Sequence, residues 1–472
     1  MIKKCLNLNK TRVISFFVAT IIFLSTVVAT VDSAVNTNNE ETISTQAKWT
    51  VMIYFAGDHH RGNELDYTLN FLKEIGSSNN FNLVGLFDAE PYGDTSYYYF
   101  EDGFYRPLPW HPSECNLADP MIFERFLTLT INDFPADNFA LFTLSAWGSG
   151  WQGVFSDTHG TGSGKTLSLI TMPQMSEVLK KVTNNGLNKI DFWGTDVCIS
   201  GMTEVAYQIA PYVDYMAANE EHGFGQGEFS DDGRPMEWNY SFFLQELKNN
   251  SDMTPEQFAK SVVECYRAGT ITSKILVNIK PPKWYPIVKY HTTLSTIDLK
   301  NISEISNAVN TLGSVLKDNL NKCKNEIKKA RSETREYGKL YRKFWFQPSR
   351  ITFGLAMDPL GYDCFIDLYD FAEKLRYKTQ TTEIKNACEQ VMNAMNTTVI
   401  ANEAEPTDPS HGLSIYFPEL KCQYDQSIWK GMGNKNFRNI PSPYEDLRFS
   451  QDTSWDEFLK EYLHIPSIVD EE

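Results

Sequence analysis

A chain of 472 residues is long enough to form one large α/β domain with an extension, or two domains. Apolar residues make up 42% of it, as in ordinary globular proteins, and no low-complexity tract interrupts it. The formal net charge of -17 argues against nucleic acid or an anionic membrane surface as the main partner. An acidic surface would attract basic peptides, although solubility alone also explains such a charge.

Residues 1–34 have the form of a secretory signal peptide. Four basic residues precede an uncharged run at 13–31, and Ala34 is a small residue suited to cleavage. The run is also just long enough to span a bilayer, so an uncleaved anchor is the alternative, although its Ser and Thr residues favour cleavage. In either case we expect the remaining chain to be secreted or held at the cell surface, with membrane contact only through this segment. Residues 35–48 are polar and are expected to form a linker.

The number of cysteines leaves one without a partner. Cys5 precedes the apolar run and would leave with the signal, so seven of the eight cysteines remain. An odd number in an oxidising compartment means that at least one stays unpaired. Cys198, which lies in a glycine-flanked turn, is the natural candidate, although several of the others can equally be buried thiols of the core.

Between residues 49 and 280, apolar strands alternate with amphipathic helices. We expect strands at 49–56, 81–88, 138–144, 189–194 and 212–217, and an edge hairpin at 96–101. The helices are expected at 65–75, 120–131, 171–183, 202–210 and 254–268. Crossovers of this length predict an α/β fold with a mostly parallel sheet and helices on both faces. The loops after Ser145 and Thr195 would then leave the carboxyl ends of their strands and face each other.

A proline-rich stretch at 280–286 is the candidate domain boundary. It separates a core at 49–280 from a mainly helical region at 281–472. In this second region we expect a strand at 293–297, a long charged helix from 301 to about 336, helices near Leu368 and Ile384, and a short helix at 455–463. The apolar run at 412–418 is predicted to return a last strand to the sheet.

Cys198 follows a short apolar strand, and a helix is expected immediately behind it. A side chain on such a turn lies at the carboxyl edge of the sheet, where open α/β folds bind their ligands. Taken alone, a cysteine in a turn is more often structural than catalytic. In one group of cysteine peptidases, however, a histidine at the end of a neighbouring strand lies about 50 residues before the nucleophile. Counting back from Cys198 reaches the loop SAWGSGW at 145–151.

Four segments in the right order resemble the clostripain family of cysteine endopeptidases, which is related to caspases and gingipains. They are WTVMIYFAGD at 49–58, TDVCISGMTEVAYQIA at 195–210, NEEHGFG at 219–225 and GLSIYFP at 412–418. The resemblance implies a caspase-like core, cleavage of peptides after Arg or Lys, and no organic cofactor. Some members of that family depend on calcium, which the resemblance leaves open here, but we identify no metal site: no Cys/His set has zinc-ligand spacing, and no EF-hand or phosphate loop is present.

Trp147 departs from the family pattern. The family loop usually carries a histidine where AWGSGW at 146–151 has Trp147. Indole nitrogen only donates and cannot take a proton from a thiol. Without an imidazole no group is left to activate the Cys198 thiol as a thiolate, and the departing amine has no general acid. In a comparable serine enzyme, loss of the base costs on the order of 10⁶ in turnover.

Other histidines are candidates for a substitute base. His59 and His60 follow the first strand on the same sheet edge, His159 lies just past SAWGSGW, and His222 lies in the NEEHGFG loop. Any of them could reach Cys198, but histidines in loops are usually solvated surface groups.

The resemblance also assigns an acidic pocket and an oxyanion hole. Asp196 matches an acidic residue that lines the family's pocket for a basic side chain, and its alternative role is a helix cap. Glu220 and Glu221 could add negative charge, or simply belong to a solvated loop. Gly148 matches the glycine whose amide joins that of Cys198 in the oxyanion hole, and the alternative is that its loop needs a positive φ.

The sequence leaves three functions open. The leading hypothesis is a secreted pseudopeptidase that keeps Cys198 and an acidic pocket but lacks the base, and that binds peptides or proteins containing Arg or Lys. The second is an active cysteine endopeptidase that uses a substitute histidine. The third is a structural or adhesion protein of the cell surface in which the cleft has no role.

Overall fold

The computed structural model of the chain describes residues 46–58, 64–145, 148, 150–155, 157, 169–223, 238–274, 287–338, 364–424 and 443–465. The expected signal segment at 1–34 and most of the linker lie outside the described residues. None of the helices in the described part has the length and apolar character needed to cross a membrane.

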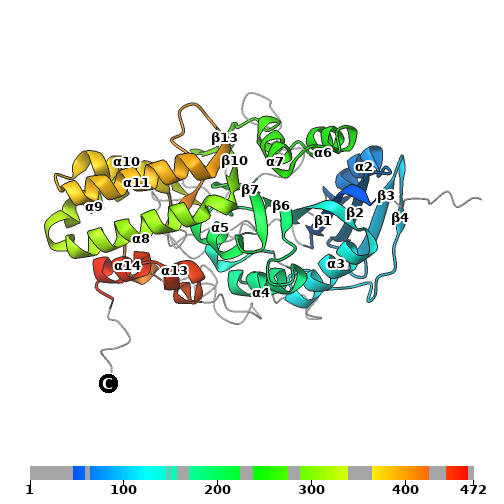
Figure 1. The fold of residues 1–472 in the computed structure, drawn as a ribbon, viewed down its shortest axis with the longest axis horizontal. Coiled ribbons are helices and arrows are strands. Elements are labelled where there is room, and N and C mark those ends of the chain that lie inside the picture. Colours follow the sequence, from blue (N-terminus) through cyan, green and yellow to red (C-terminus); the bar gives the residue numbers. More distant parts are fainter. Residues whose placement is uncertain are drawn as a thin grey trace, which may run out of the picture. The chain divides into compact units, whose positions relative to one another are not determined.

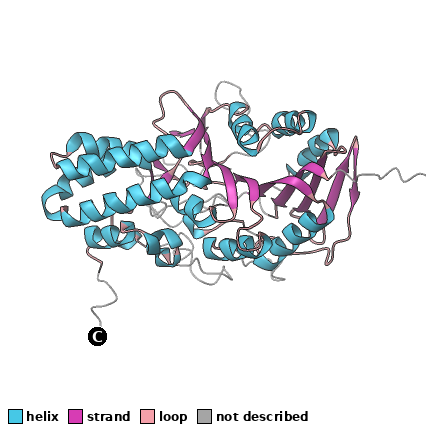
Figure 2. Cartoon of the chain, viewed as in Figure 1, coloured by secondary structure: helices cyan, strands magenta, loops and turns pink. Residues whose placement is uncertain are grey.

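A twisted nine-stranded sheet forms the centre of the described chain (Figure 2). Its order across the sheet is β13 (Val399–Ala404), β10 (Thr293–Asp298), β7 (Val213–Ala218), β6 (Ile190–Asp196), β5 (Ala136–Ser145), β1 (Ala47–Ala56), β2 (Phe81–Asp88), β3 (Ser96–Glu101) and β4 (Phe104–Pro107). The five strands from β7 to β2 are parallel, and the pairs at both edges are antiparallel. The predicted mostly parallel α/β sheet is therefore confirmed.

Helices cover both faces of the sheet because its central strands are apolar on both sides. They are α2 (Leu65–Ile75), α3 (Pro120–Asp133), α4 (Met172–Val182), α5 (Thr203–Ile209), α6 (Tyr240–Asn249) and α7 (Pro255–Glu264). Met52 and Tyr54 of β1 pack in the core beneath α3, α4 and α5, whereas Val51 and Phe55 pack with α2, α6 and α7. Figure 1 shows these two sets of helices on opposite faces.

The region after 287 is largely helical and shares the core of one sheet face. Its helices are α8 (Ile302–Asp318), α9 (Leu320–Glu333), α10 (Leu368–Lys378), α11 (Thr382–Thr398), α13 (Arg448–Asp452) and α14 (Trp455–Leu463). The single helix expected from 301 to about 336 is two helices. It breaks at Asn319, whose side-chain amide donates to the carbonyl of Val315 at 2.9 Å, because asparagine competes with the backbone for helical hydrogen bonds.

The last predicted strand lies in a different sheet from the one expected. β14 (Ser414–Tyr416) pairs with β12 (Phe365–Asp367), which pairs with β11 (Glu336–Tyr337), while β10 and β13 take the sheet edge. The expectation that 412–418 returns to the central sheet is therefore wrong. The Ser414 amide instead donates to the carbonyl of Gly201 at 2.9 Å, so β14 docks on the backbone behind Cys198.

A hairpin flanks the proposed domain boundary. β8 (Thr270–Lys274) pairs antiparallel with β9 (Ile287–His291), and the proline-rich stretch between them lies outside the described residues. The boundary at 280 stays a prediction. Because β10 and β13 extend the central sheet, the region after it contributes strands as well as helices to the core.

Candidate active site

The two loops expected to face each other begin side by side. β5 and β6 are parallel neighbours, and Leu144 pairs with Asp196 at their carboxyl ends. Ser145 ends β5 and the turn that carries Cys198 follows Asp196 directly. The register of the sheet therefore brings the loop after β5 to the turn after β6, as the alternation of strands and helices predicts.

Gly148 lies in contact with the backbone of Cys198. A Cβ built on Gly148 would stand 2.3 Å from the carbonyl oxygen of Cys198 and 3.2 Å from its amide nitrogen. The φ of Gly148 lies outside the left-handed region, so backbone conformation does not require glycine there. The reason for glycine is close approach to the cysteine, which any side chain would prevent.

The turn after Cys198 is strained and tightly held. Ile199 has a φ of 48°, a conformation rarely adopted by a β-branched residue, which costs on the order of 1–3 kcal/mol. Its amide donates to the carbonyl of Glu221 at 3.1 Å, and the amide of Gly201 donates to that of Asn219 at 2.8 Å. The segment after β7 thus fixes the turn. No sequence signal marks this conformation, because isoleucine is not a turn residue.

The Cys198 thiol is buried, with 3% of the residue exposed. Its Sγ lies 3.8 Å from the carbonyl oxygen of Gly223. None of the six cysteines whose side chains the structure describes forms a disulfide; they are Cys115, Cys198, Cys265, Cys323, Cys364 and Cys388. Cys198 is therefore a thiol, as expected, but so are the other described cysteines, and the absence of a disulfide does not single it out.

Asp196 is buried beside the cysteine turn and is not the cap of the following helix. Its Oδ2 accepts a hydrogen bond from the Tyr240 hydroxyl at 3.1 Å, and 4% of the residue is exposed. Met202 occupies the N-cap position of α5. A Cβ on Gly223 would stand 3.7 Å from the Asp196 Oδ1, so this carboxylate and Cys198 both lie beside Gly223.

Glu220 and Glu221 are buried and hold the backbone together, unlike side chains of a solvated loop. Glu220 accepts from the amide of Gly412 at 2.8 Å, and burial raises its pKa well above the ordinary value. Glu221 forms an ion pair with Arg335, 3.2 Å from Oε2 to Nη2, and accepts from the amide of Gly338 at 3.1 Å. Their assignment to substrate binding stays a prediction, and each carboxylate already accepts a backbone hydrogen bond within the chain.

Of the candidate replacement bases, only His222 lies in the described chain. His59, His60 and His159, together with Trp147, lie outside the described residues. His222 is buried, 4.0 Å from its Nε2 to the Glu221 Oε1, and it directly precedes Gly223, whose carbonyl lies beside the Cys198 sulfur.

His411 is a histidine that no sequence motif marks. Its Nδ1 lies 3.1 Å from the Asp367 Oδ1, and its ring stacks on Tyr369. Burial lowers the pKa of this imidazole, but the hydrogen bond and charge of Asp367 outweigh burial and raise it overall. No pattern in the sequence pairs residues 367 and 411, which β12 and β14 bring together.

Comparison with known proteins identifies the fold. The structure of an inactive zymogen of a C11 protease from Parabacteroides distasonis is similar at a TM-score of 0.54 and 18% identity, over 87% of this chain and 99% of that one. A secreted C11 cysteine protease from Bacteroides thetaiotaomicron, solved with an irreversible peptide inhibitor, matches at 0.51 and 16% identity, over 79% and 93%. A further secreted C11 cysteine protease from that organism, iotapain, matches at 0.53 and 10% identity, over 86% and 99%.

At these identities the structural matches show the fold, which is caspase-like. No curated protein matches the chain. The model of the clostripain family matches residues 53–462, which is most of the sequence and includes the Gly148 loop, the Cys198 turn and the β14 docking strand. The chain therefore belongs to the clostripain family.

Proposed function

We propose that this protein is a clostripain-family homologue that binds peptides but has lost peptidase activity. The observation that carries the proposal is the contact between Gly148 and the backbone of Cys198. It supports the assignment of these residues to the oxyanion and nucleophile positions of the family. The residue directly before Gly148 in the chain is Trp147, where the family carries its histidine.

The chemistry that such a site can still perform is limited by the missing base. A thiol becomes a strong nucleophile only as thiolate, which an adjacent imidazole normally provides. Collapse of the tetrahedral intermediate also needs a proton for the leaving amine. An indole supplies neither function, because its nitrogen only donates a hydrogen bond. The strained turn and the buried thiol then serve binding without cleavage.

The expected ligand is a peptide or protein segment that contains Arg or Lys. Asp196 is buried beside Cys198 and carries the negative charge that would recognise such a side chain. One family relative of known structure was solved with a peptide inhibitor bound, and it is a secreted protein. We propose the same class of ligand and secretion for this chain.

A second candidate function has one observation in its favour. His222 is buried one residue from Gly223, whose carbonyl oxygen is 3.8 Å from the Cys198 sulfur. A histidine in that neighbourhood could act as a substitute base in a rearranged site. The protein would then be an active endopeptidase with the same preference for basic residues.

The test measures cleavage of an Arg-containing fluorogenic peptide and alkylation of Cys198 by iodoacetamide at neutral pH. We expect no turnover and slow alkylation in the wild type, and measurable turnover in Trp147→His, because that change restores the one missing group. Cys198→Ala in the Trp147→His background controls for contaminating peptidases and should be inactive.

Three results would each decide against one part of the proposal. Turnover by the wild type that Cys198→Ala abolishes would overturn it directly. Loss of that turnover in His222→Ala, with retention in the control His411→Gln, would establish the substitute base. If Asp196→Asn binds the peptide as tightly as the wild type does, Asp196 is not the acid that recognises a basic side chain.

A further inference from the structure

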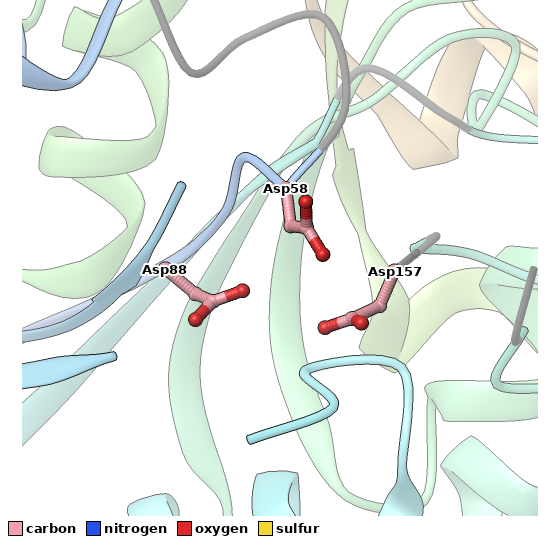
Figure 3. A group of neighbouring side chains, drawn as sticks. All are labelled: Asp58, Asp88 and Asp157. Carbon is pink, nitrogen blue, oxygen red and sulfur yellow. The ribbon is translucent and has the colours of Figure 1, made fainter. Parts of the chain in front are cut away.

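Three buried aspartates from separate segments meet at the carboxyl edge of the sheet. Asp58 follows β1, Asp88 ends β2, and Asp157 follows the described segment 150–155. One carboxylate oxygen of each lies within 4.8 Å of those of the other two, and each residue is at most 1% exposed. Figure 3 shows the three carboxylates turned toward one another.

Asp88 has an oxygen that the described chain leaves without a donor. Its Oδ1 accepts a hydrogen bond from the Thr95 hydroxyl, whereas its Oδ2 is buried and has no hydrogen-bond partner among the described residues. Burying a polar atom without a partner is costly. The geometry therefore indicates a ligand at this oxygen.

The three carboxylates indicate which kind of ligand would bind there. Carboxylate oxygens are the ligands of hard divalent cations, and Ca²⁺ takes six to eight of them at about 2.3–2.6 Å. Mg²⁺, by contrast, is usually bound by only one or two carboxylates and keeps several of its waters. Three buried carboxylates that converge from separate segments therefore suit Ca²⁺ better than Mg²⁺.

We propose that Asp58, Asp88 and Asp157 bind one Ca²⁺ that links the ends of β1 and β2 to the segment 150–155. Val154 of that segment bridges to Gly148, and Gly148 lies against the backbone of Cys198. The site is thus a structural one, which holds the loop that forms one side of the cysteine site. It requires no catalytic activity, so its test is independent of the proposed function.

The experiment uses the full chain stripped of metal, with Ca²⁺ alone as the probe. We expect Ca²⁺ to raise the Tm saturably by a few degrees, because it binds the folded state only, and Mg²⁺ to raise it less. Tb³⁺ should bind competitively with Ca²⁺ and show luminescence excited through aromatic residues. Hydrogen exchange should slow at 150–155 when Ca²⁺ is present.

Asp88→Asn and Asp157→Asn should each weaken Ca²⁺ binding at least tenfold. Asn keeps the shape of Asp88 and its oxygen for Thr95, so this variant should fold. Glu204→Gln is the matched control, because Glu204 is a lone buried carboxylate that also has an oxygen without a partner in the described chain. It should bind Ca²⁺ like the wild type.

A wild-type Tm that none of Ca²⁺, Mg²⁺ and Mn²⁺ changes, together with no Tb³⁺ luminescence, would overturn the proposal. Wild-type Ca²⁺ affinity in Asp88→Asn would do the same. If neither variant folds, the exchange measurement on the wild type decides, since protection by Ca²⁺ away from 150–155 places the ion elsewhere.

Discussion

Two groups of buried acids lie beyond the carboxyl ends of the same sheet and differ in how their charge is compensated. Glu221 shares Arg335 with Asp408, at 3.2 and 3.0 Å. In the other group, Asp88 faces Asp157, and no Lys or Arg of the described chain forms an ion pair with Asp88. A buried charge without a counter-charge is strongly destabilising. The chain supplies that counter-charge to the first group, and we propose that Ca²⁺ supplies it to the second.

Removing Arg335 would leave Glu221 and Asp408 without a counter-charge, like the aspartates around Asp88. Of the changes considered, this one should lower the stability of the protein most. Arg335→Ala leaves Glu221 and Asp408 buried without their cation, which is expected to lower the free energy of unfolding by about 3–5 kcal/mol. The measurement is urea denaturation followed by circular dichroism. Arg106→Ala is the control, since its pair with Glu101 is exposed and worth at most about 1 kcal/mol.

A loss in Arg335→Ala as small as in the control would contradict the comparison. Glu221 and Asp408 would then tolerate burial without a cation, and an orphaned oxygen on Asp88 would no longer argue for a ligand.

Glu204 is a buried acid whose pKa is raised by burial and not by a neighbouring charge, so it shows the effect of burial on pKa by itself. Its Oε1 accepts from the Tyr416 amide at 2.9 Å and the Tyr444 hydroxyl at 2.8 Å, and burial raises its pKa from 4.5 to about 7. The folded state therefore keeps a proton that the unfolded chain releases near pH 4.5. The stability that this group contributes falls as pH rises from about 4.5 to 7, and it is constant above that range.

Glu204→Gln should remove this pH dependence. We expect the variant to match the wild type near pH 4 and to exceed it by about 3 kcal/mol near pH 8, with the amide oxygen keeping both hydrogen bonds. Denaturation curves at a series of pH values measure the difference. A difference that is constant with pH would mean that Glu204 is ionised in the folded protein.

Two glycines, Gly148 and Gly223, lie on either side of the Cys198 turn and differ in how much room a side chain would have. Gly148→Ala places a Cβ 2.3 Å from the Cys198 carbonyl oxygen, so the loop must move, and we expect a loss of about 1–3 kcal/mol with altered alkylation of Cys198. Gly223→Ala is the matched control on the other side of the turn. Its Cβ meets its nearest atom, Asp196 Oδ1, at 3.7 Å, an ordinary contact. Equal losses in both variants would show that the Gly148 contact is not special.

The fold could be predicted because its signals are local. The strands at 81–88 and 96–101 and the helix at 65–75 have the expected bounds, since apolar runs and caps are written in the adjacent residues. The destination of β14 could not be predicted. It depends on the amide of Ser414 finding the carbonyl of Gly201, a pairing across more than 200 residues that leaves no periodic pattern.

The site was predictable where a strand end fixes it and not where side chains from distant segments meet. The register of β5 and β6 brings Gly148 to Cys198, as expected. The ion pair of Glu221 with Arg335 and the cluster around Asp88 join residues from separate loops. Single acidic residues in loops are too common for sequence alone to identify such partners.

Tyr240 gives the smallest effect and decides what Asp196 does. Tyr240→Phe removes the hydroxyl that donates to the Asp196 Oδ2 at 3.1 Å, and should cost about 0.5–1.5 kcal/mol. The charge of Asp196 stays in place, so binding of an Arg-containing peptide should change by less than about threefold.

Asp196→Asn removes that charge and should weaken binding at least tenfold if Asp196 is the pocket acid. Equal, small losses of stability in both variants, with peptide binding unchanged, would instead make Asp196 a structural acceptor for Tyr240. Tyr377→Phe, at an exposed tyrosine, is the control for both measurements.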